Sequence, residues 1–261
     1  MISKMFRIAL TIVLASFALS SAAWAATCSN SSATGVYGSV GGGIDSDGAP
    51  SGSVSQLTLD STTGTFTGTS TSSHNGVIET YSLSGTYAVA SNCTVTGTVT
   101  AGSGEPQPFS AVVTSTGGVK EADGKTGATT GSFLVAQGSP KCTNAGVKGS
   151  FGFQATGVFV TGAPFTGPLD LIGELALSVN KSGDGVITGE VAGSENGTIL
   201  TFADEPVTGS YSISANCTGT ATITPKGESA LNFSVVVVDG GKEMLAIETD
   251  ADTVVTATLQ H

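Results

Sequence analysis

The chain has 261 residues, of which 11% are charged, and its 20 Asp and Glu outnumber its nine Lys and Arg to give a net charge of −11. Nucleic acids and anionic membrane surfaces are bound non-specifically through Lys and Arg. After Arg7 the next basic residue of these two types is Lys120, so we expect no nucleic-acid partner and no attachment to an anionic membrane. The low charge and 39% apolar content are also unlike those of disordered chains.

Residues 1–25 predict a signal peptide. Lys4 and Arg7 precede an apolar run, and Ala23-Trp24-Ala25 supplies the small-x-small pattern before a cleavage site. The run is too short to span a bilayer, and no later stretch is apolar enough to do so. We therefore expect an exported chain, periplasmic or secreted, that begins near Ala26 and has no membrane span.

The first half of the remaining chain, residues 26–138, predicts a series of short strands. "SVSQLTLD", "GTFTGTSTS", "GTYAVAS", "CTVTGTVTA" and "PFSAVVTS" alternate apolar or aromatic residues with Ser or Thr, the period of a half-buried strand. Turn sequences such as "DSTTG" and "ADGKTG" separate them. No window shows helical periodicity.

The second half, residues 139–261, repeats the first. "GTYAVASNCT" from Gly85 returns as "GSYSISANCT" from Gly209, "QLTLD" returns as "ELALS", and "FSAVV" returns as "FSVVV". An internal duplication with about eight strands per unit predicts an all-β chain of two tandem antiparallel barrels or sandwiches. The meander order favours up-and-down barrels, because closure removes exposed strand edges.

The four cysteines predict two disulfides. Four cysteines allow three pairings, and the duplication favours Cys28–Cys93 and Cys142–Cys217, which join equivalent positions of the two units. Each bridge should stabilise the fold by about 4 kcal/mol. This pairing leaves no thiol for nucleophilic catalysis and no cysteine cluster for zinc.

The repeated pattern G-x-Y-x-[VI]-x-x-x-C-T, with "VVVVDGGKEMLAIETD" in the second unit, resembles uncharacterised exported bacterial tandem-repeat β-proteins. The first unit departs from it, with "AVVTSTGGVKEADGKTG" at the same place. The architecture that this resemblance implies is similar to calycin or allene-oxide-cyclase-like barrels. It implies no catalytic residues.

Few side chains indicate chemistry. His74, in the polar stretch "TSSHNG", and His261, the last residue, have no counterpart in the other unit, and loop tips and termini commonly carry idle polar residues. Glu79, Glu105 and Glu190 lie in no recognisable motif. We therefore predict no catalytic and no cofactor-binding residues. Tyr81 is left as a surface contact, whereas the other tyrosines of the repeats are expected in the cores.

Calcium is the one metal that the sequence suggests. "DSDG" places Asp45 and Asp47 two residues apart, and "NKSGDG" contains Asn180 and Asp184, all of which offer the oxygen ligands that calcium prefers. Turn chemistry explains both stretches equally well. A glutamate at the twelfth position of a calcium loop is missing.

Three roles remain open for a chain of this kind. The first is a non-enzymatic binding or cell-envelope module, whose partner is a small apolar ligand or another envelope or extracellular protein. The second is a structural or adhesive extracellular component, and the third is a small-molecule isomerase or cyclase working in a barrel mouth. An internal cavity of several hundred Å³ favours the first role, whereas filled barrels favour the second.

Overall fold

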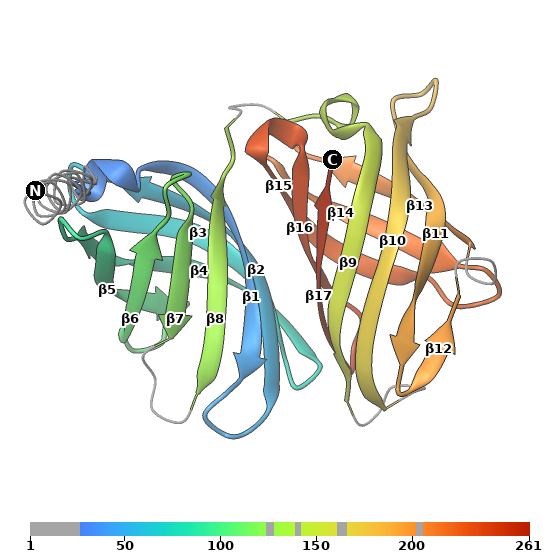
Figure 1. The fold of residues 1–261 in the computed structure, drawn as a ribbon, viewed down its shortest axis with the longest axis horizontal. Helices are drawn as coiled ribbons and strands as arrows, with labels where there is room; N and C mark the ends of the chain where they lie inside the picture. The colour runs from blue at the N-terminus through green and yellow to red at the C-terminus, as the bar shows by residue number, and fades with distance from the viewer. Residues whose placement is uncertain (1–26, 124–127, 139–141, 161–165, 202–205) are drawn as a thin grey trace, which may run out of the picture.

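Two closed antiparallel β-barrels follow one another along the chain in the computed structural model (Figure 1). The structure describes residues 27–123, 128–138, 142–160, 166–201 and 206–261. The predicted signal peptide, residues 1–25, lies outside the described residues. The prediction of an all-β fold with two tandem barrels is confirmed.

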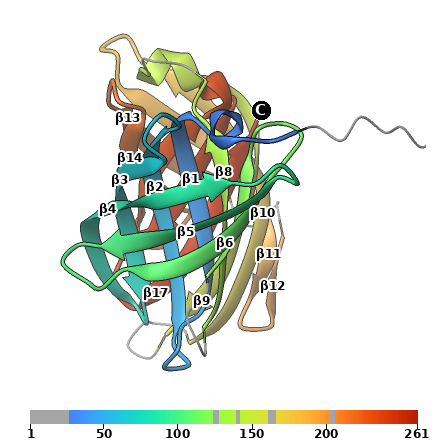
Figure 2. The ribbon, with the colours of Figure 1, turned by 90° about the vertical axis from the view of Figure 1, so that its left-hand side faces the viewer.

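The first barrel is an eight-stranded meander in which each strand pairs with its neighbours in sequence and β8 closes onto β1. Its strands are β1 (Gly35–Ile44), β2 (Pro50–Asp60), β3 (Thr65–His74), β4 (Val77–Val89), β5 (Thr94–Ala101), β6 (Gln107–Val113), β7 (Val119–Asp123) and β8 (Thr129–Ala136). Seen from its outer side, β4, β5 and β6 cross in front of β1, β2 and β8 (Figure 2). The barrel therefore has two crossing walls.

The second barrel repeats this plan with one addition. Its strands are β9 (Gly149–Phe159), β10 (Gly167–Val179), β11 (Gly185–Glu195), β12 (Thr198–Leu200), β13 (Pro206–Ile213), β14 (Thr218–Pro225), β15 (Leu231–Val238), β16 (Glu243–Glu248) and β17 (Thr253–Gln260). The strand β17 closes onto β9, and the short β12 extends the end of β11 as a hairpin. The added strand lies outside the closed ring of eight.

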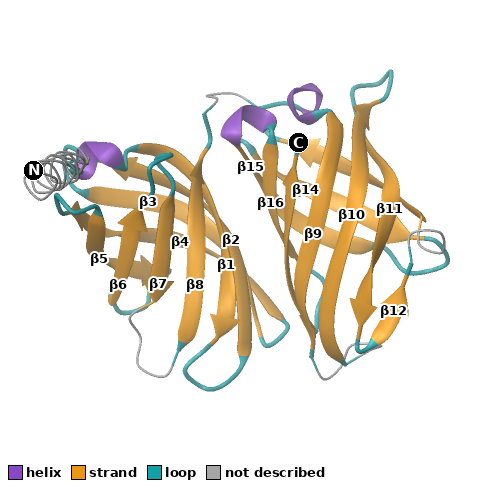
Figure 3. Ribbon diagram, viewed as in Figure 1, coloured by secondary structure: helices purple, strands orange, loops and turns teal. Residues whose placement is uncertain are grey.

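Helical structure in the described residues is confined to three short 3₁₀ turns: η1 (Asn30–Ser32), η2 (Asn144–Val147) and η3 (Asp239–Gly241). Figure 3 places all three at the same end of the two barrels. Of these described helices, none has the length and apolar character needed to cross a membrane.

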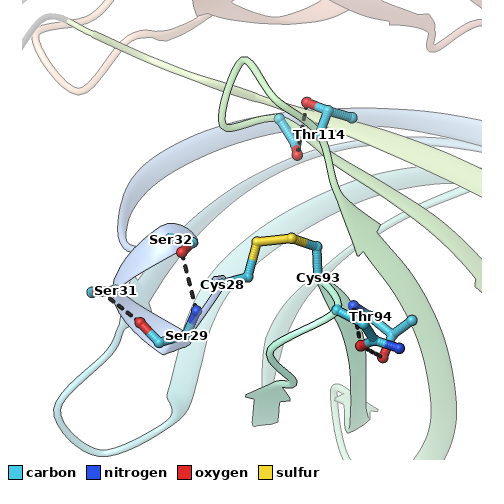
Figure 4. Close-up of a disulfide and its surroundings, with 9 residues drawn as sticks. Cys28, Ser29, Ser31, Ser32, Cys93, Thr94 and Thr114 are labelled. Atoms are coloured by element: carbon cyan, nitrogen blue, oxygen red, sulfur yellow. Dashed lines mark hydrogen bonds between the residues drawn. A yellow bond between two sulfur atoms is a disulfide. The ribbon is translucent and has the colours of Figure 1, made fainter. Parts of the chain in front are cut away.

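A disulfide fastens a short plug, residues 28–33 in the first barrel and residues 142–147 in the second, across one end of each barrel. Cys28 is bonded to Cys93 and Cys142 to Cys217, the pairing that the duplication predicts. Each bridge links the segment just before η1 or η2 to the tight turn that follows the repeated strand, as Figure 4 shows for the first barrel. Cys93 and Cys217 adopt left-handed backbone conformations in these turns, with φ of 67° and 69°.

The plugs are also held by hydrogen bonds that recur in both barrels. The side-chain carbonyl of Asn30 accepts the backbone N–H of Val89 at 2.8 Å, and that of Asn144 accepts the N–H of Ile213 at 2.7 Å. Ala33 and Val147 insert beneath them with only 1% of their surface exposed. We define this end of each barrel as its base and the opposite end as its mouth.

The two barrels pack against each other through their outer faces. β1, β2 and β3 of the first barrel contact β15, β16 and β17 of the second (Figure 1). The contact has its own apolar core, formed by Val40, Val54, Val236, Val238, Leu245 and Ile247. Gly38 makes the close approach feasible, since a Cβ there would lie 2.4 Å from Cγ1 of Val238.

Hydrogen bonds at the edges of this contact hold the orientation of the barrels. The backbone N–H of Asp252 donates to the carbonyl of Gly76 at 3.0 Å, and that of Gly240 donates to the carbonyl of Gln137 at 2.8 Å. The Ser73 hydroxyl also donates to the carbonyl of Thr253. The two barrels are therefore packed against each other and are not merely joined by a linker.

Candidate binding cavity

The first barrel is hollow. A cavity of about 490 Å³ lies between its two walls, and this volume is typical of sites for small organic ligands. Its lower part, next to the base, is apolar. The side chains there come from both walls and include Leu57, Leu59, Phe66, Val95, Val119 and Leu134.

One wall of the cavity carries a row of serines. Ser39, Ser55 and Ser70 lie side by side on β1, β2 and β3 because the strand register places them directly opposite one another. All three are buried, and the Ser55 hydroxyl donates to Oγ of Ser70 at 2.9 Å. The facing wall offers apolar side chains such as Leu83 and Phe109. The middle of the cavity is thus polar on one side and apolar on the other.

The upper part of the cavity, toward the mouth, carries carboxylates and a tyrosine. Glu121 of β7, Asp45 beyond the end of β1 and Glu105 between β5 and β6 line the cavity together with Tyr81 of β4. The Ser132 hydroxyl donates to Oε2 of Glu121 at 2.8 Å. Tyr81, which the sequence left as a surface contact, is therefore a half-buried part of the cavity wall.

The second barrel is filled, although its strands pair in the same register. The void among its core residues measures about 30 Å³, which is room for one or two water molecules. In the second barrel Phe153 lies opposite Gly173, and Gly173 lies opposite Val191. These are the positions that Ser39, Ser55 and Ser70 occupy in the first barrel. Large apolar side chains thus occupy two of the three serine positions.

The same replacement continues around the second barrel. Glu121 lies opposite Ser132 in the first barrel, and the equivalent pair in the second barrel is Ala246 and Ala257. Ser53 corresponds to Leu171, which also lines the residual void. At these equivalent positions the second copy therefore lacks the serine hydroxyls and the carboxylate of the first.

The base of each barrel is built alike and carries a buried tyrosine. The Tyr87 hydroxyl donates to the carbonyl of Ala33 at 2.7 Å, and the Tyr211 hydroxyl donates to the carbonyl of Asn144 at 2.9 Å. Burial raises the pKa of both phenols above the ordinary value, so they remain neutral donors. Because hollow and filled barrels share this arrangement, we interpret it as structural.

Two of the four residues predicted to bind calcium lie beside a histidine at the mouth of the first barrel. Nε2 of His74 is 3.2 Å from Oδ2 of Asp45 and 3.5 Å from Oδ2 of Asp47, and one ligand atom from each residue lies within 4.8 Å of the others. The pKa of Asp47 is lowered, chiefly by the backbone N–H of Ala49 and to a smaller extent by His74. The sequence did not connect His74 with this group.

The other two predicted calcium ligands lie in the second barrel, in the turn between β10 and β11. The Asn180 amide donates to Oδ2 of Asp184 at 3.0 Å, and its carbonyl oxygen accepts the backbone N–H groups of Ser182 and Asp184. These contacts are those of a tight turn. Calcium binding at either pair stays a prediction.

Glu248 is an unusual acid inside the second barrel. It lies on β16, is 1% exposed and lines the residual void together with apolar side chains such as Phe153 and Leu231. Neither carboxyl oxygen has a hydrogen-bond partner among the described residues. Burial, with a smaller contribution from Asp250, raises the pKa of Glu248 to about 8. The group is therefore neutral at physiological pH, and the void is too small for an organic ligand.

The chain was also compared with known proteins. No protein-family model and no curated protein matches it. Among solved structures it is similar to a protein of unknown function from the DUF3598 family of Nostoc punctiforme. The two are 11% identical, and the match covers 88% of this chain and 96% of that one with a TM-score of 0.28.

Proposed function

We propose that this protein is an exported, non-enzymatic binding protein whose first barrel holds one small, largely apolar molecule. The observation that carries the proposal is the contrast between the two copies of the barrel, one with a cavity of about 490 Å³ and the other with about 30 Å³. An eight-stranded barrel encloses a space that side chains can just fill or that can hold one small ligand. The two copies represent these two outcomes.

The residues that open the cavity also support a binding role. Ser39 and Ser70 are small and polar where the filled copy has Phe153 and Val191. Apolar side chains at these positions would fill the barrel and stabilise it, as they do in the second copy. A hollow and partly polar interior therefore lowers the stability of the fold, which is the usual trade-off at a functional site.

The compartment is proposed on two grounds. The two disulfides indicate an oxidising environment, and residues 1–25 have the pattern of a signal peptide. We therefore place the protein in the periplasm or outside the cell. The resemblance to calycin-like barrels is consistent with ligand binding inside the barrel.

The proposal is tested by titrating the oxidised protein with N-phenyl-1-naphthylamine, a neutral probe whose fluorescence rises in apolar sites. We expect saturable binding with one site per chain. The double variant Ser39→Phe/Ser55→Gly reproduces the Phe153–Gly173 pair of the filled barrel and should abolish binding while far-UV circular dichroism stays unchanged.

A matched control is Ser84→Phe, which adds the same bulk at an exposed position of β4 and should leave probe binding intact. Failure of the wild-type protein to give a saturable signal would contradict the proposal. Unchanged binding by the filled variant would contradict it equally, because the probe would then be bound elsewhere.

A further inference from the structure

The Asp and Glu side chains among the described residues that line the cavity of the first barrel give its wall a negative charge. Glu121, Asp45 and Glu105 line the cavity, and Glu79 lines the hollow at the mouth that is continuous with it. None of the described residues that line the cavity is Lys or Arg. The sole imidazole lining the hollow belongs to His74, which faces Asp45 and Asp47.

Of the three acids that line the cavity itself, Glu121 is the one that lies on a strand. Register puts it opposite Ala111 on one side and Ser132 on the other, and its half-buried carboxylate is oriented by the Ser132 hydroxyl at 2.8 Å. A strand and a hydrogen bond therefore fix the position of this charge, whereas Glu105 is exposed on a loop.

A fixed negative charge in a half-enclosed apolar barrel has a strong influence on what can enter. Charges interact more strongly in such a site than in water, and a cleft lined by one sign of charge concentrates ligands of the opposite sign. A carboxylate or phosphate head group would be repelled by Glu121 and by the acids at the mouth. An ammonium group would be attracted and could donate hydrogen bonds to them.

The depth of the cavity sets the orientation of such a ligand. The apolar side chains lie next to the base, the three serines lie in the middle of one wall, and the carboxylates lie toward the mouth. An apolar body buried against Leu57, Phe66 and Val119 would leave its charged end near Glu121. The cavity thus has a direction, from an apolar base to an acidic mouth.

We propose that the ligand of the first barrel is an apolar molecule that carries a protonated amine, bound with its apolar end at the base and its ammonium group beside Glu121. This inference rests on the proposed function, since it names the class of molecule that the same cavity takes.

The test is a competition assay in which dodecylamine, dodecanol and dodecanoate, each below its aggregation concentration, displace N-phenyl-1-naphthylamine from the oxidised protein. The three share one hydrocarbon chain and differ only in the head group. We expect dodecylamine to compete at a concentration roughly tenfold or more below that of dodecanoate, because a hydrogen bond between charged groups is worth at least that factor.

The variant Glu121→Gln keeps the shape of the side chain and removes its charge. It should reduce the preference for the amine by about tenfold, measured as the ratio of the dodecylamine and dodecanol concentrations that displace the probe from the same variant. The control Glu190→Gln removes one exposed charge from the second barrel and should leave the preference as it is.

The possible results separate the two proposals. Equal competition by all three compounds, a preference for dodecanoate, or an amine preference that Glu121→Gln leaves intact would overturn the cationic ligand while ligand binding by the barrel still stands. Absence of saturable probe binding to the wild-type protein would overturn both.

Discussion

Replacing Glu248 by Gln should stabilise the protein, and the gain should grow with pH. Glu248 is 1% exposed, has no hydrogen-bond partner among the described residues and has a pKa of about 8. The folded protein therefore keeps this proton up to about pH 8, whereas the unfolded chain loses it above the ordinary value of 4.5. Glutamine has the same shape and cannot ionise.

The sign and size follow from the difference in proton binding. Between pH 4.5 and about 8 the folded state binds more protons than the unfolded state, so this group lowers the free energy of unfolding as the pH rises. Its contribution is intact below pH 4.5 and is lost progressively up to about pH 8. The full loss is about 5 kcal/mol, and about 3 kcal/mol of it has occurred at pH 7.

Urea unfolding followed by far-UV circular dichroism measures this effect, because residues 27–261 contain no Trp. Glu248→Gln should match the wild-type protein near pH 4.5 and exceed its unfolding free energy by about 5 kcal/mol at about pH 9. Other titrating groups cancel in the difference between the two proteins.

A second glutamate of the same strand provides the control. Glu243 is also buried, but its Oε1 accepts a hydrogen bond from Nε2 of Gln260 at 3.1 Å. We expect no gain in stability from Glu243→Gln. A difference between Glu248→Gln and wild type that stays constant from about pH 4.5 to 9 would refute the reasoning, because Glu248 would then ionise in the folded protein as it does in the unfolded chain.

Two further predictions concern the plug and the contact between the barrels. Replacing both Cys28 and Cys93 by Ala should lower the free energy of unfolding, measured by urea unfolding, by about 4 kcal/mol. An unchanged urea midpoint would show that the bridge does not constrain the unfolded chain. Gly38→Ala places a Cβ 2.4 Å from Val238 and should cost about 1–3 kcal/mol through overpacking. The equivalent glycine of the second copy, Gly152, has its nearest neighbour at 3.7 Å, so Gly152→Ala should leave the midpoint unchanged; equal effects of the two substitutions would contradict the close contact at Gly38.

The architecture was predictable because its signals are local and repeated. Alternation along each strand indicates which residues face inward, and the second copy tests every assignment made in the first. Tyr87 and Tyr211, at the same place in the two repeats, are both buried. The plugs, in contrast, were not predicted, since three or four residues of 3₁₀ turn leave no periodic pattern.

One sequence difference between the two copies is explained only by the packing of the barrels against each other. In the second copy the outward-facing Val236 and Val238 are buried against the first barrel, so both faces of "VVVVDGGKEMLAIETD" are apolar. In the first copy the outward-facing Val112 is 48% exposed and Lys120 is exposed. The sequence shows that the two copies differ in this segment, but it does not indicate which surface covers the second copy.

The cavity could not be predicted, because alternation identifies the inward-facing residues but not whether they fill the barrel. The comparison that reveals it, Ser39 and Ser70 against Phe153 and Val191, needs the register across three strands. Tyr81 illustrates the same limit. Its inward direction follows from the alternation of β4, yet only the closed barrel shows that this direction leads into a cavity rather than a core.

The duplication finally separates what keeps the barrel folded from what the barrel can bind. The disulfide, the asparagine of the plug and the buried tyrosine occur in both copies, and one of those copies has no cavity for a ligand. Features that a filled barrel shares cannot be specific to ligand binding. Ser39, Ser70 and Glu121 occur only in the hollow copy, so substitutions there should change binding, whereas Tyr87→Phe should change stability.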